Sequence, residues 1–284
     1  MRVLVTGGTG FVGRQVVAAL RALGAAVAAP TRPDADLLTL PGRHAAIAAA
    51  EQAEILVHAA WLTRPGAYWH SPANLDWVAA TLDLARLFAA AGGRRFVQVG
   101  SCAEYDWFGG DAAPWPETRA CRPHTQYGSA KLLAWTVLSH GPLSAANARL
   151  FSPIGPGEHP ARLLPSLIRA AVAGETLATG PAALTRDLID VRDAGQAIAE
   201  LALSAVRGPV NIGSGRPVTL GTLAAAVGAR QVAFGARPLP PGEPLTLLPD
   251  TTLLSQALGF RPRVPLDQTI ADAVAHWRAL ACAA

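Results

Sequence analysis

The stretch "VLVTGGTGFVG" places three glycines at three-residue spacing, directly after an apolar run and directly before the helical pattern "RQVVAALRAL". In this position Gly7 permits a tight turn, Gly10 lets the backbone approach a pyrophosphate, and Gly13 allows helix and strand to pack closely. The start of the helix, with Phe11 and Val12, offers unpaired N–H groups and a partial positive charge to phosphates. A strand, a glycine turn and a helix in this order predict a dinucleotide-binding site.

Short apolar runs alternate with longer helical patterns through the first half of the chain. Runs such as "AEILVHAA" and "RRFVQVGS" are apolar almost throughout, as in parallel strands buried on both faces. The pattern predicts an α/β fold with a Rossmann-type, doubly wound parallel sheet. We expect residues 1–152 to form the dinucleotide-binding domain, with 187–214 returning to it. The Pro- and Gly-rich texture of 153–186 and 215–284 predicts a smaller, loop-rich substrate-binding lobe over the carboxyl edge of the sheet.

Cofactor preference is expected at the end of the second strand, in "VAAPTRPDAD". An Asp or Glu at this place binds the ribose 2′-hydroxyl of NAD, but here Thr31 takes the position and Arg32 follows. No carboxylate repels a 2′-phosphate, and a guanidinium is present to pair with it. These residues favour NADP(H) as the cofactor, and NAD(H) remains possible. The alternative is that Arg32 belongs to a solvated loop and has no role in cofactor binding.

Tyr127 stands four residues before Lys131 in "HTQYGSAKLL", so on a helix the two side chains share a face. The strand "RRFVQVG" delivers Ser101 at its carboxyl end, 26 residues before Tyr127. Carboxyl ends of parallel strands face the ligand crevice, so we expect the three groups to converge there.

With these motifs the chain resembles the extended short-chain dehydrogenase/reductases, the branch of NAD(P)-dependent nucleotide-sugar epimerases, dehydratases and reductases. The resemblance rests on "TGGTGFVG", "VHAAW", "NLDWVAATLDLA", "GSCAEYD", "YGSAK", "RLFSPIGPGE", "RDLIDVRDAGQAI" and "NIGSG", in the order of the family from residue 6 to residue 215. It implies that Tyr127 is the general acid/base. It implies that Lys131 also hydrogen-bonds the nicotinamide ribose and that Ser101 holds the substrate oxygen.

The resemblance implies further roles, residue by residue. Additional cofactor contacts are expected at Asp36 and Leu37 (adenine), Ala59 and Ala60, Asn74, and Pro153 (nicotinamide amide). Additional substrate contacts are expected at Cys102, Ser152 and Arg186, although a salt bridge within the small lobe is an equal alternative for Arg186. His58, inside a strand, is expected to be structural. The long helical stretches 74–92 and 124–140 resemble those that pair two subunits in this family, which implies a homodimer.

Departures from the family pattern narrow the reaction. A dehydratase carries an acidic pair directly after the catalytic hydroxyl, whereas Cys102 and Ala103 follow Ser101, and Glu104 comes one position too late. Ser152 replaces an asparagine that holds the substrate in many relatives. These departures favour a reductase of a keto group on a nucleotide-linked deoxysugar, with nucleotide-sugar epimerisation second.

Six aromatic residues gather in stretches expected at the carboxyl edge: Trp61, Tyr68, Trp69, Tyr105, Trp107 and Trp115. They either shape an apolar substrate site or fill a loop-rich core. The first possibility makes a non-sugar carbonyl reductase the third reading. A non-catalytic NADP(H) sensor is the fourth, and the presence of Tyr127, Lys131 and Ser101 together argues against it.

Composition excludes several other classes. The chain is 51% hydrophobic with a net charge of +4 and no long basic run, which argues against disorder and nucleic-acid binding. The apolar runs are too short for a bilayer span, and the N-terminus lacks a signal-peptide layout. Three scattered cysteines predict neither a disulfide framework nor a metal site. We therefore expect a cytoplasmic, membrane-free enzyme with a small-molecule substrate.

Overall fold

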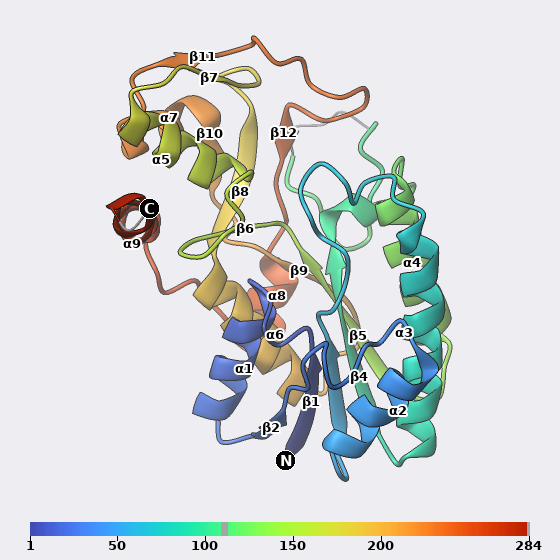
Figure 1. Ribbon diagram of the computed structural model, residues 1–284. Helices are drawn as coiled ribbons and strands as arrows, with labels where there is room; N and C mark the ends of the chain where they lie inside the picture. The colour runs from blue at the N-terminus through green and yellow to red at the C-terminus, as the bar shows by residue number, and fades with distance from the viewer. Residues whose placement is uncertain (109–112, 283–284) are drawn as a thin grey trace.

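The computed structural model describes residues 1–108 and 113–282, and a six-stranded sheet forms the centre of its larger part (Figure 1). The strand order is β2-β1-β3-β4-β5-β9, and every hydrogen-bonded pair in it is parallel. In chain order the strands are β1 (Arg2–Thr6), β2 (Ala26–Ala28), β3 (Ile55–His58), β4 (Arg95–Ser101), β5 (Ser144–Leu150) and β9 (Gly208–Ile212). The predicted doubly wound α/β fold is confirmed. The order changes direction between β1 and β3, where such sheets bind ligands at their carboxyl ends.

Helices cover both faces of this sheet (Figure 1). One face carries α1 (Gly13–Ala22) and α6 (Val191–Leu203), which pack against each other. The other face carries α2 (Leu40–Ala49), α3 (Ala73–Ala90) and α4 (Gln126–Ser139). The strands between them are buried on both sides, as their continuous apolar sequences require.

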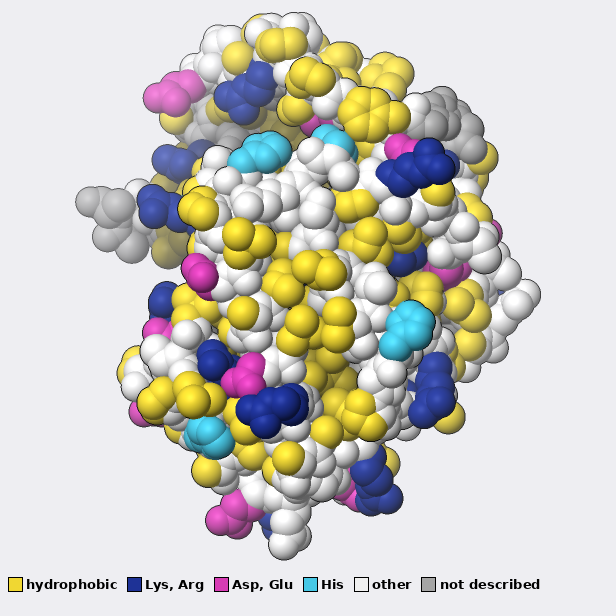
Figure 2. All heavy atoms as spheres, turned by 90° about the vertical axis from the view of Figure 1, so that its right-hand side faces the viewer, with side chains coloured by type: hydrophobic (Ala, Val, Ile, Leu, Met, Phe, Trp, Pro, Cys, Tyr) yellow, Lys and Arg dark blue, Asp and Glu magenta, His cyan; other side chains and the backbone are white. Residues whose placement is uncertain are grey.

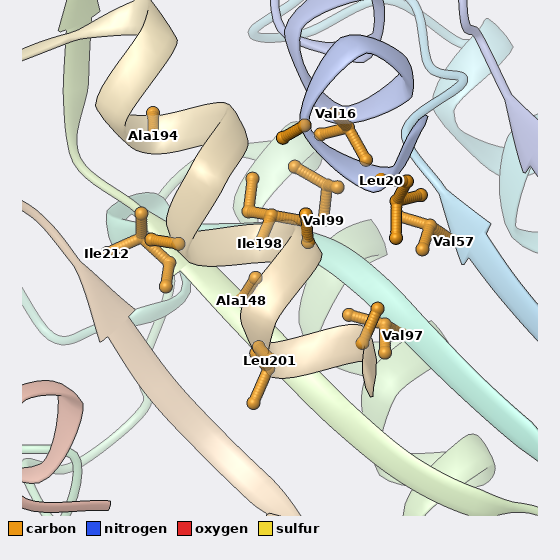
Figure 3. Close-up of a cluster of buried hydrophobic side chains, with 14 of the residues drawn as sticks. Val16, Leu20, Val57, Val97, Val99, Ala148, Ala194, Ile198, Leu201 and Ile212 are labelled. Carbon is orange, nitrogen blue, oxygen red and sulfur yellow. The ribbon is translucent and has the colours of Figure 1, made fainter. Parts of the chain in front are cut away.

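The main core lies between the sheet and the α1/α6 layer (Figure 3). Val16 and Leu20 of α1 meet Ile198 and Leu201 of α6 over Val97 of β4, and all five are completely buried. Burying a side chain of this size contributes roughly 1.5–3 kcal/mol each. This face therefore holds β1, β3 and β4 in register, and with them the loops at their carboxyl ends.

A smaller lobe follows β5 and lies at the upper end of the molecule in Figure 1. Its central sheet has the order β10-β8-β12, with β6 paired to β8, and a two-stranded β11-β7 ribbon lies apart. The elements are β6 (Ser152–Ile154), α5 (Leu163–Ala173), β7 (Leu177–Ala178), β8 (Thr185–Asp190), β10 (Pro217–Thr219), α7 (Leu220–Val227), β11 (Val232–Ala233), β12 (Thr246–Leu247) and α9 (Leu266–Cys282). A separate apolar cluster forms its core. The short α8 (Thr252–Leu258) packs back on the main core through Leu254.

In the part of the chain that the structure describes, no helix combines the length and the apolar character needed to cross a bilayer.

Candidate active site at the carboxyl edge of the sheet

The glycine turn between β1 and α1 is built by close backbone contacts. Gly7 has a φ of +70°, and a Cβ on it would lie 2.7 Å from the backbone nitrogen of Ala60. A Cβ on Gly13 would lie 2.0 Å from the carbonyl oxygen of Gly7. The turn therefore folds onto itself and against the segment after β3, which contains Ala59 and Ala60. This is the arrangement that the spacing predicts.

The N-terminus of α1 is left open by this turn. Its N-cap residue, Val12, makes no side-chain cap, and the first turn of this fully described helix holds no acidic residue. Within the described part of the chain, the backbone N–H groups of Phe11 and Val12 donate to no protein acceptor. Free donors, a positive helix end and a glycine-rich turn fit a pyrophosphate.

The segment after β2 carries the residues predicted to contact the adenosine end. The Arg32 side chain is 76% exposed, and its Nε lies 3.6 Å from Asp36 Oδ2. The Thr31 hydroxyl donates to Asp34 Oδ2 at 2.7 Å. Leu37 is buried, and its carbonyl accepts from Arg43 Nη1 at 2.8 Å. Arg32 is thus an exposed cation after β2 with a carboxylate, that of Asp36, beside it.

Ser101, Tyr127 and Lys131 come from adjacent elements. Ser101 ends β4, and the other two lie in the first turns of α4, where Thr125 caps the helix by accepting from the Gly128 N–H at 3.1 Å. The ammonium of Lys131 donates to the carbonyl of Val99, two residues before Ser101, at 2.8 Å. The Ser101 side chain lies close enough to Tyr127 to lower the pKa of its phenol. The predicted grouping of hydroxyl, phenol and amine is thus present at the end of one strand.

Burial sets the protonation of the tyrosine–lysine pair. It raises the pKa of the Tyr127 phenol above its ordinary value, as does neighbouring Tyr68, while the nearby Ser101 side chain opposes the rise. Burial also lowers the pKa of the Lys131 ammonium to about 7, with the Glu104 carboxylate opposing. Both groups are therefore sensitive to any charge that enters the site.

Aromatic rings surround Tyr127. The rings of Tyr68 and Trp69 contact it edge-on, with centroids 4.9 and 5.7 Å away, and Trp61 lies at 6.5 Å. We call these three residues the aromatic wall. By contrast Tyr105 and Trp115 pack on each other in the interior and are almost completely buried. Five of the six aromatics thus divide between site and core, and the sixth, Trp107, is buried against Trp69 with ring centres 6.1 Å apart.

Asn74 organises the aromatic wall. Its side chain is completely buried, and Oδ1 accepts from the indole N–H of Trp61 at 2.9 Å. Its amide nitrogen donates to the carbonyls of Tyr68 and Ser71, at 2.8 and 3.0 Å. These contacts hold the loop before α3 in place, so in this structure the amide of Asn74 is engaged with the protein.

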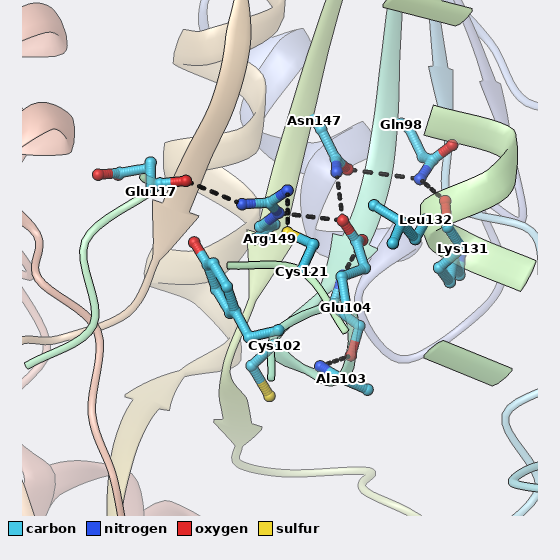
Figure 4. Close-up of polar contacts among 12 residues, drawn as sticks. Gln98, Cys102, Ala103, Glu104, Glu117, Cys121, Lys131, Leu132, Asn147 and Arg149 are labelled. Atoms are coloured by element: carbon cyan, nitrogen blue, oxygen red, sulfur yellow. Dashed lines mark hydrogen bonds and ion pairs between the residues drawn. The ribbon is translucent and has the colours of Figure 1, made fainter. Parts of the chain in front are cut away.

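Glu104 anchors the end of β4 through the polar contacts drawn in Figure 4. The chain turns into a short 3-10 helix at Cys102–Glu104, and the fully buried Glu104 carboxylate accepts from the Ser101 N–H at 2.8 Å. It also accepts from the Asn147 amide at 2.7 Å and pairs with Arg149 at 3.0 Å. The Glu104 carboxylate is therefore fully engaged by Ser101, Asn147 and Arg149 inside the fold.

The residues predicted to contact substrate come from both lobes. Ser152 and Pro153 form the start of β6, beside β8. Arg186 of β8 pairs with Glu243 at 2.6 Å, which is the alternative considered from the sequence. Burial raises the pKa of the Cys102 thiol to about 12, although the positive charge of Arg186 opposes this rise. Within the described residues, no group of His, Cys, Asp or Glu side chains is arranged to hold a metal ion.

His58 has the structural role expected of it. Its ring is buried between the hydroxyls of Thr6 and Thr81, at 2.8 and 2.9 Å. Burial and the nearby Lys131 charge lower its pKa to about 3, so it is neutral.

The sequence interpretation missed Arg162 and Glu158. Arg162 lies with its guanidinium 5.4 Å from the Tyr68 ring centre and donates to the Thr63 carbonyl at 3.5 Å. Glu158 is 8% exposed, and its Oε2 is buried without a hydrogen-bond partner in the described chain. Burial raises its pKa to about 8, and the charge of Arg162 opposes. Only the run "GPGEHPAR", a loop with several charges in an otherwise apolar chain, signalled these residues.

Solved structures of similar fold extend over nearly the whole chain. The UDP-glucose 4-epimerase of Thermotoga maritima, solved with UDP-glucose, is 21% identical, with a TM-score of 0.88 and coverage of 99% of this chain and 100% of that one. MoeE5, solved with UDP-glucose and NAD, is 25% identical, with a TM-score of 0.78 and coverage of 99% and 100%. RMD of Pseudomonas aeruginosa, solved with NADPH, is 21% identical, with a TM-score of 0.80 and coverage of 99% and 100%.

The sequence itself matches a protein family over most of its length. The description "NAD dependent epimerase/dehydratase family" applies to residues 3–213, which include the glycine turn, Ser101, Tyr127 and Lys131. Fold, site geometry and sequence therefore agree that the chain belongs to the NAD-dependent epimerase/dehydratase family, as an NAD(P)-dependent enzyme of the extended short-chain dehydrogenase/reductase type.

Proposed function

We propose that this enzyme moves a hydride to and from a carbon of a nucleotide-linked sugar, with Tyr127 as acid/base and epimerisation as the net reaction. The observation that carries the proposal is the convergence of Ser101, Tyr127 and Lys131 at the end of β4. The open N-terminus of α1 fits the cofactor pyrophosphate. When bound there, the cofactor supplies or accepts the hydride at its nicotinamide ring.

The chain's own residues manage the proton. The Tyr127 phenolate takes the proton of the substrate hydroxyl during oxidation, and the phenol that results returns it during reduction. In the free protein, burial keeps this phenol neutral. The Lys131 ammonium favours the phenolate, because a positive charge nearby lowers the pKa of an acid. Ser101 donates to the substrate oxygen and stabilises the charge that develops on it.

Epimerisation takes precedence over reduction because of the comparisons. Solved structures similar to this chain include UDP-glucose 4-epimerases, and a MoeE5 complex with UDP-glucuronic acid is 25% identical. This order reverses the one that the sequence departures favour. The position of Glu104, turned away beneath β4, argues against a dehydratase.

The test is to incubate the purified enzyme with UDP-glucose, UDP-galactose and UDP-glucuronic acid and to follow the anomeric protons by NMR. We expect interconversion of a 4-epimer pair without net consumption of added cofactor. Absence of epimerisation for all three sugars, in protein shown to bind the dinucleotide, would contradict the proposal.

Reduction by NADPH is the second candidate, and Arg32 is the observation that favours it. Its guanidinium is exposed, with Asp36 3.6 Å away, and it follows β2, the strand whose end is expected to contact the adenosine ribose. Arg32→Ala should weaken NADPH binding by about 10- to 100-fold, the value of one or two charge-assisted hydrogen bonds, and leave NADH binding unchanged. Calorimetric titration with both cofactors measures this, and equal losses for both would remove the argument. Stoichiometric oxidation of NADPH by a 4-keto-deoxysugar nucleotide would then identify the reductase.

We also propose that α3 and α4 pair two copies of the chain. Figure 2 views the molecule from their side and shows hydrophobic side chains spread over this face. Leu75 of α3 is 61% exposed, and Leu133 and Val137 of α4 are about half exposed. Apolar side chains one helical turn apart on a surface helix favour burial against a second copy.

A further inference from the structure

We propose that Trp61 is a positioning residue for Lys131, and that the face of its indole holds the buried ammonium beside Tyr127 through a cation–π contact. The inference rests on the proposed function only for the use made of Lys131. The contact itself is measurable without substrate or cofactor.

The geometry is that of a strong cation–π pair. The Lys131 Nζ lies 3.9 Å from the centre of the Trp61 ring and 6.0 Å from the centre of the Tyr127 ring. Trp61 is 9% exposed and Lys131 is 2% exposed, so water screens the contact little. Tryptophan is the best aromatic partner for a cation, and desolvation increases the strength of the interaction.

Trp61 is itself held in place. Its indole N–H donates to Asn74 at 2.9 Å, and the ring stacks on Trp77 with centroids 5.9 Å apart and planes inclined by 26°. The ring therefore presents a fixed face to the ammonium. Among the three N–H donors of Lys131, one binds the Val99 carbonyl. A π face constrains the ammonium while leaving donors for the ribose hydroxyls that the family resemblance implies.

The titratable groups around Lys131 do not offset the effect of burial on its charge, so the Trp61 ring can contribute to holding the ammonium. Glu104, in the 3-10 helix, favours the charged amine, but burial outweighs it. His58 of β3 is neutral and stands within electrostatic reach. Tyr127, on the same helix, is a neutral phenol in the free protein. Since burial disfavours the ammonium, a ring that attracts a cation increases the share of charged Lys131 near neutral pH.

The chain offers an unusually clean measurement, because Lys131 is its only lysine. Protein grown with lysine labelled with carbon-13 at Cε gives one side-chain NMR signal, and a pH titration of that signal gives the pKa of Lys131 directly. Trp61→Leu should lower this pKa by about one unit relative to the unaltered protein, the equivalent of a desolvated cation–π contact. Trp61→Phe, which keeps a weaker ring, should lower it by about half as much.

Trp69→Leu is the matched control. It removes a ring of the aromatic wall that contacts Tyr127 at 5.7 Å, and Trp69 makes no cation–π contact with Lys131. Its titration should match that of the unaltered protein. An unchanged or raised pKa in Trp61→Leu overturns the inference, because it means that the indole only excludes water. If circular dichroism shows Trp61→Leu to be unfolded, Trp61→Phe decides, and a pKa equal to or above that of the unaltered protein overturns the inference.

A kinetic measurement adds a consequence for turnover. Loss of the Lys131 charge at high pH should end activity at a pH about one unit lower in Trp61→Leu than in the unaltered enzyme. If no sugar nucleotide is turned over but the NMR midpoint moves as expected, the proposed function fails and the role of Trp61 stands. The reverse pattern rejects the role of Trp61 and leaves the function intact.

Discussion

Glu104 is a buried residue that holds a neighbouring candidate site residue, Ser101, in place. Its carboxylate holds the backbone N–H of Ser101 and neutralises Arg149, which is 3% exposed. Removing one partner of a buried ion pair leaves the other charge uncompensated, at a cost of about 3–5 kcal/mol. We therefore expect Glu104→Ala to lower the free energy of unfolding by about that amount, as measured by urea denaturation.

The double variant distinguishes the ion pair from other effects of Glu104. Glu104→Met combined with Arg149→Leu removes both charges and should recover most of the lost stability. A double variant no more stable than Glu104→Ala would show that the contact with Ser101, rather than the pair, carries the stability.

Tyr127 is the acid/base of the proposed function. Tyr127→Phe removes one oxygen from a ring enclosed by the aromatic wall, so the fold should be retained. Loss of an acid/base group costs about 10²- to 10⁴-fold in rate. We expect this loss in kcat, with cofactor affinity in calorimetry within about twofold of the unaltered enzyme, since the phenol takes no part in pyrophosphate binding. A sensor without catalysis would show the same cofactor affinity but no rate to lose.

Glu158 predicts a pH dependence of stability. Its pKa is raised from 4.5 to about 8, so the folded state retains a proton that the unfolded chain releases. The resulting stabilisation is complete below pH 4.5 and is lost as the pH rises through about 8. Between these values the unaltered protein should lose about 3–5 kcal/mol more than Glu158→Gln, which cannot ionise. Urea denaturation across this pH range tests the difference, and parallel curves would contradict it.

At the scale of elements, the sequence predicts the parts whose signal is local. The strands ending at Thr6 and Ser101 are buried on both faces, and an uninterrupted apolar run indicates this. The helix α2 has a weaker signal. Its N-cap is Thr39, which accepts from the Gly42 N–H, and Pro41 lies in its first turn. The sequence at the start of this helix therefore indicates a turn as readily as a helix.

The site was predictable for a similar reason, and only in part. Tyr127 and Lys131 lie on one helix turn and Ser101 ends a strand, so periodicity and topology place them. The contact between Trp61 and Lys131 joins the loop after β3 to α4, and the free oxygen of Glu158 depends on how the loop after β6 folds. The periodicity of a sequence does not predict such contacts between distant loops.

The turn between β1 and α1 makes a prediction at this scale. A Cβ on Gly13 meets the Gly7 carbonyl at 2.0 Å, whereas a Cβ on Gly10 meets the same atom at 3.2 Å. Gly13→Ala should therefore destabilise the fold and lower its melting temperature. Gly10→Ala should change stability much less but abolish cofactor binding, because its added methyl group faces the phosphate cradle. Thermal melts with and without cofactor separate the two, and equal melting temperatures for the free variants would contradict this account.

At the scale of the molecule, the two lobes meet at the candidate site. Arg14, in the first turn of α1, donates to the Pro156 carbonyl at 2.5 Å and so joins the cofactor end to the loop after β6. Arg162, at the start of α5, reaches the carbonyl of Thr63 in the loop after β3. Site residues from both lobes are therefore fixed relative to each other by contacts at their edges.

The face opposite the α1/α6 layer argues for assembly of two copies. Val137 is 49% exposed on the same side of α4 as Leu133, and α4 packs beside α3. We expect Val137→Glu to place charges against each other across the interface and to convert a dimer into monomers. The control is Val172→Glu on α5, where a valine of 47% exposure lies far from α4 in the fold. Light scattering after size exclusion should give the mass of two chains for the control and of one for Val137→Glu. The mass of one chain for the unaltered protein would contradict the proposed assembly.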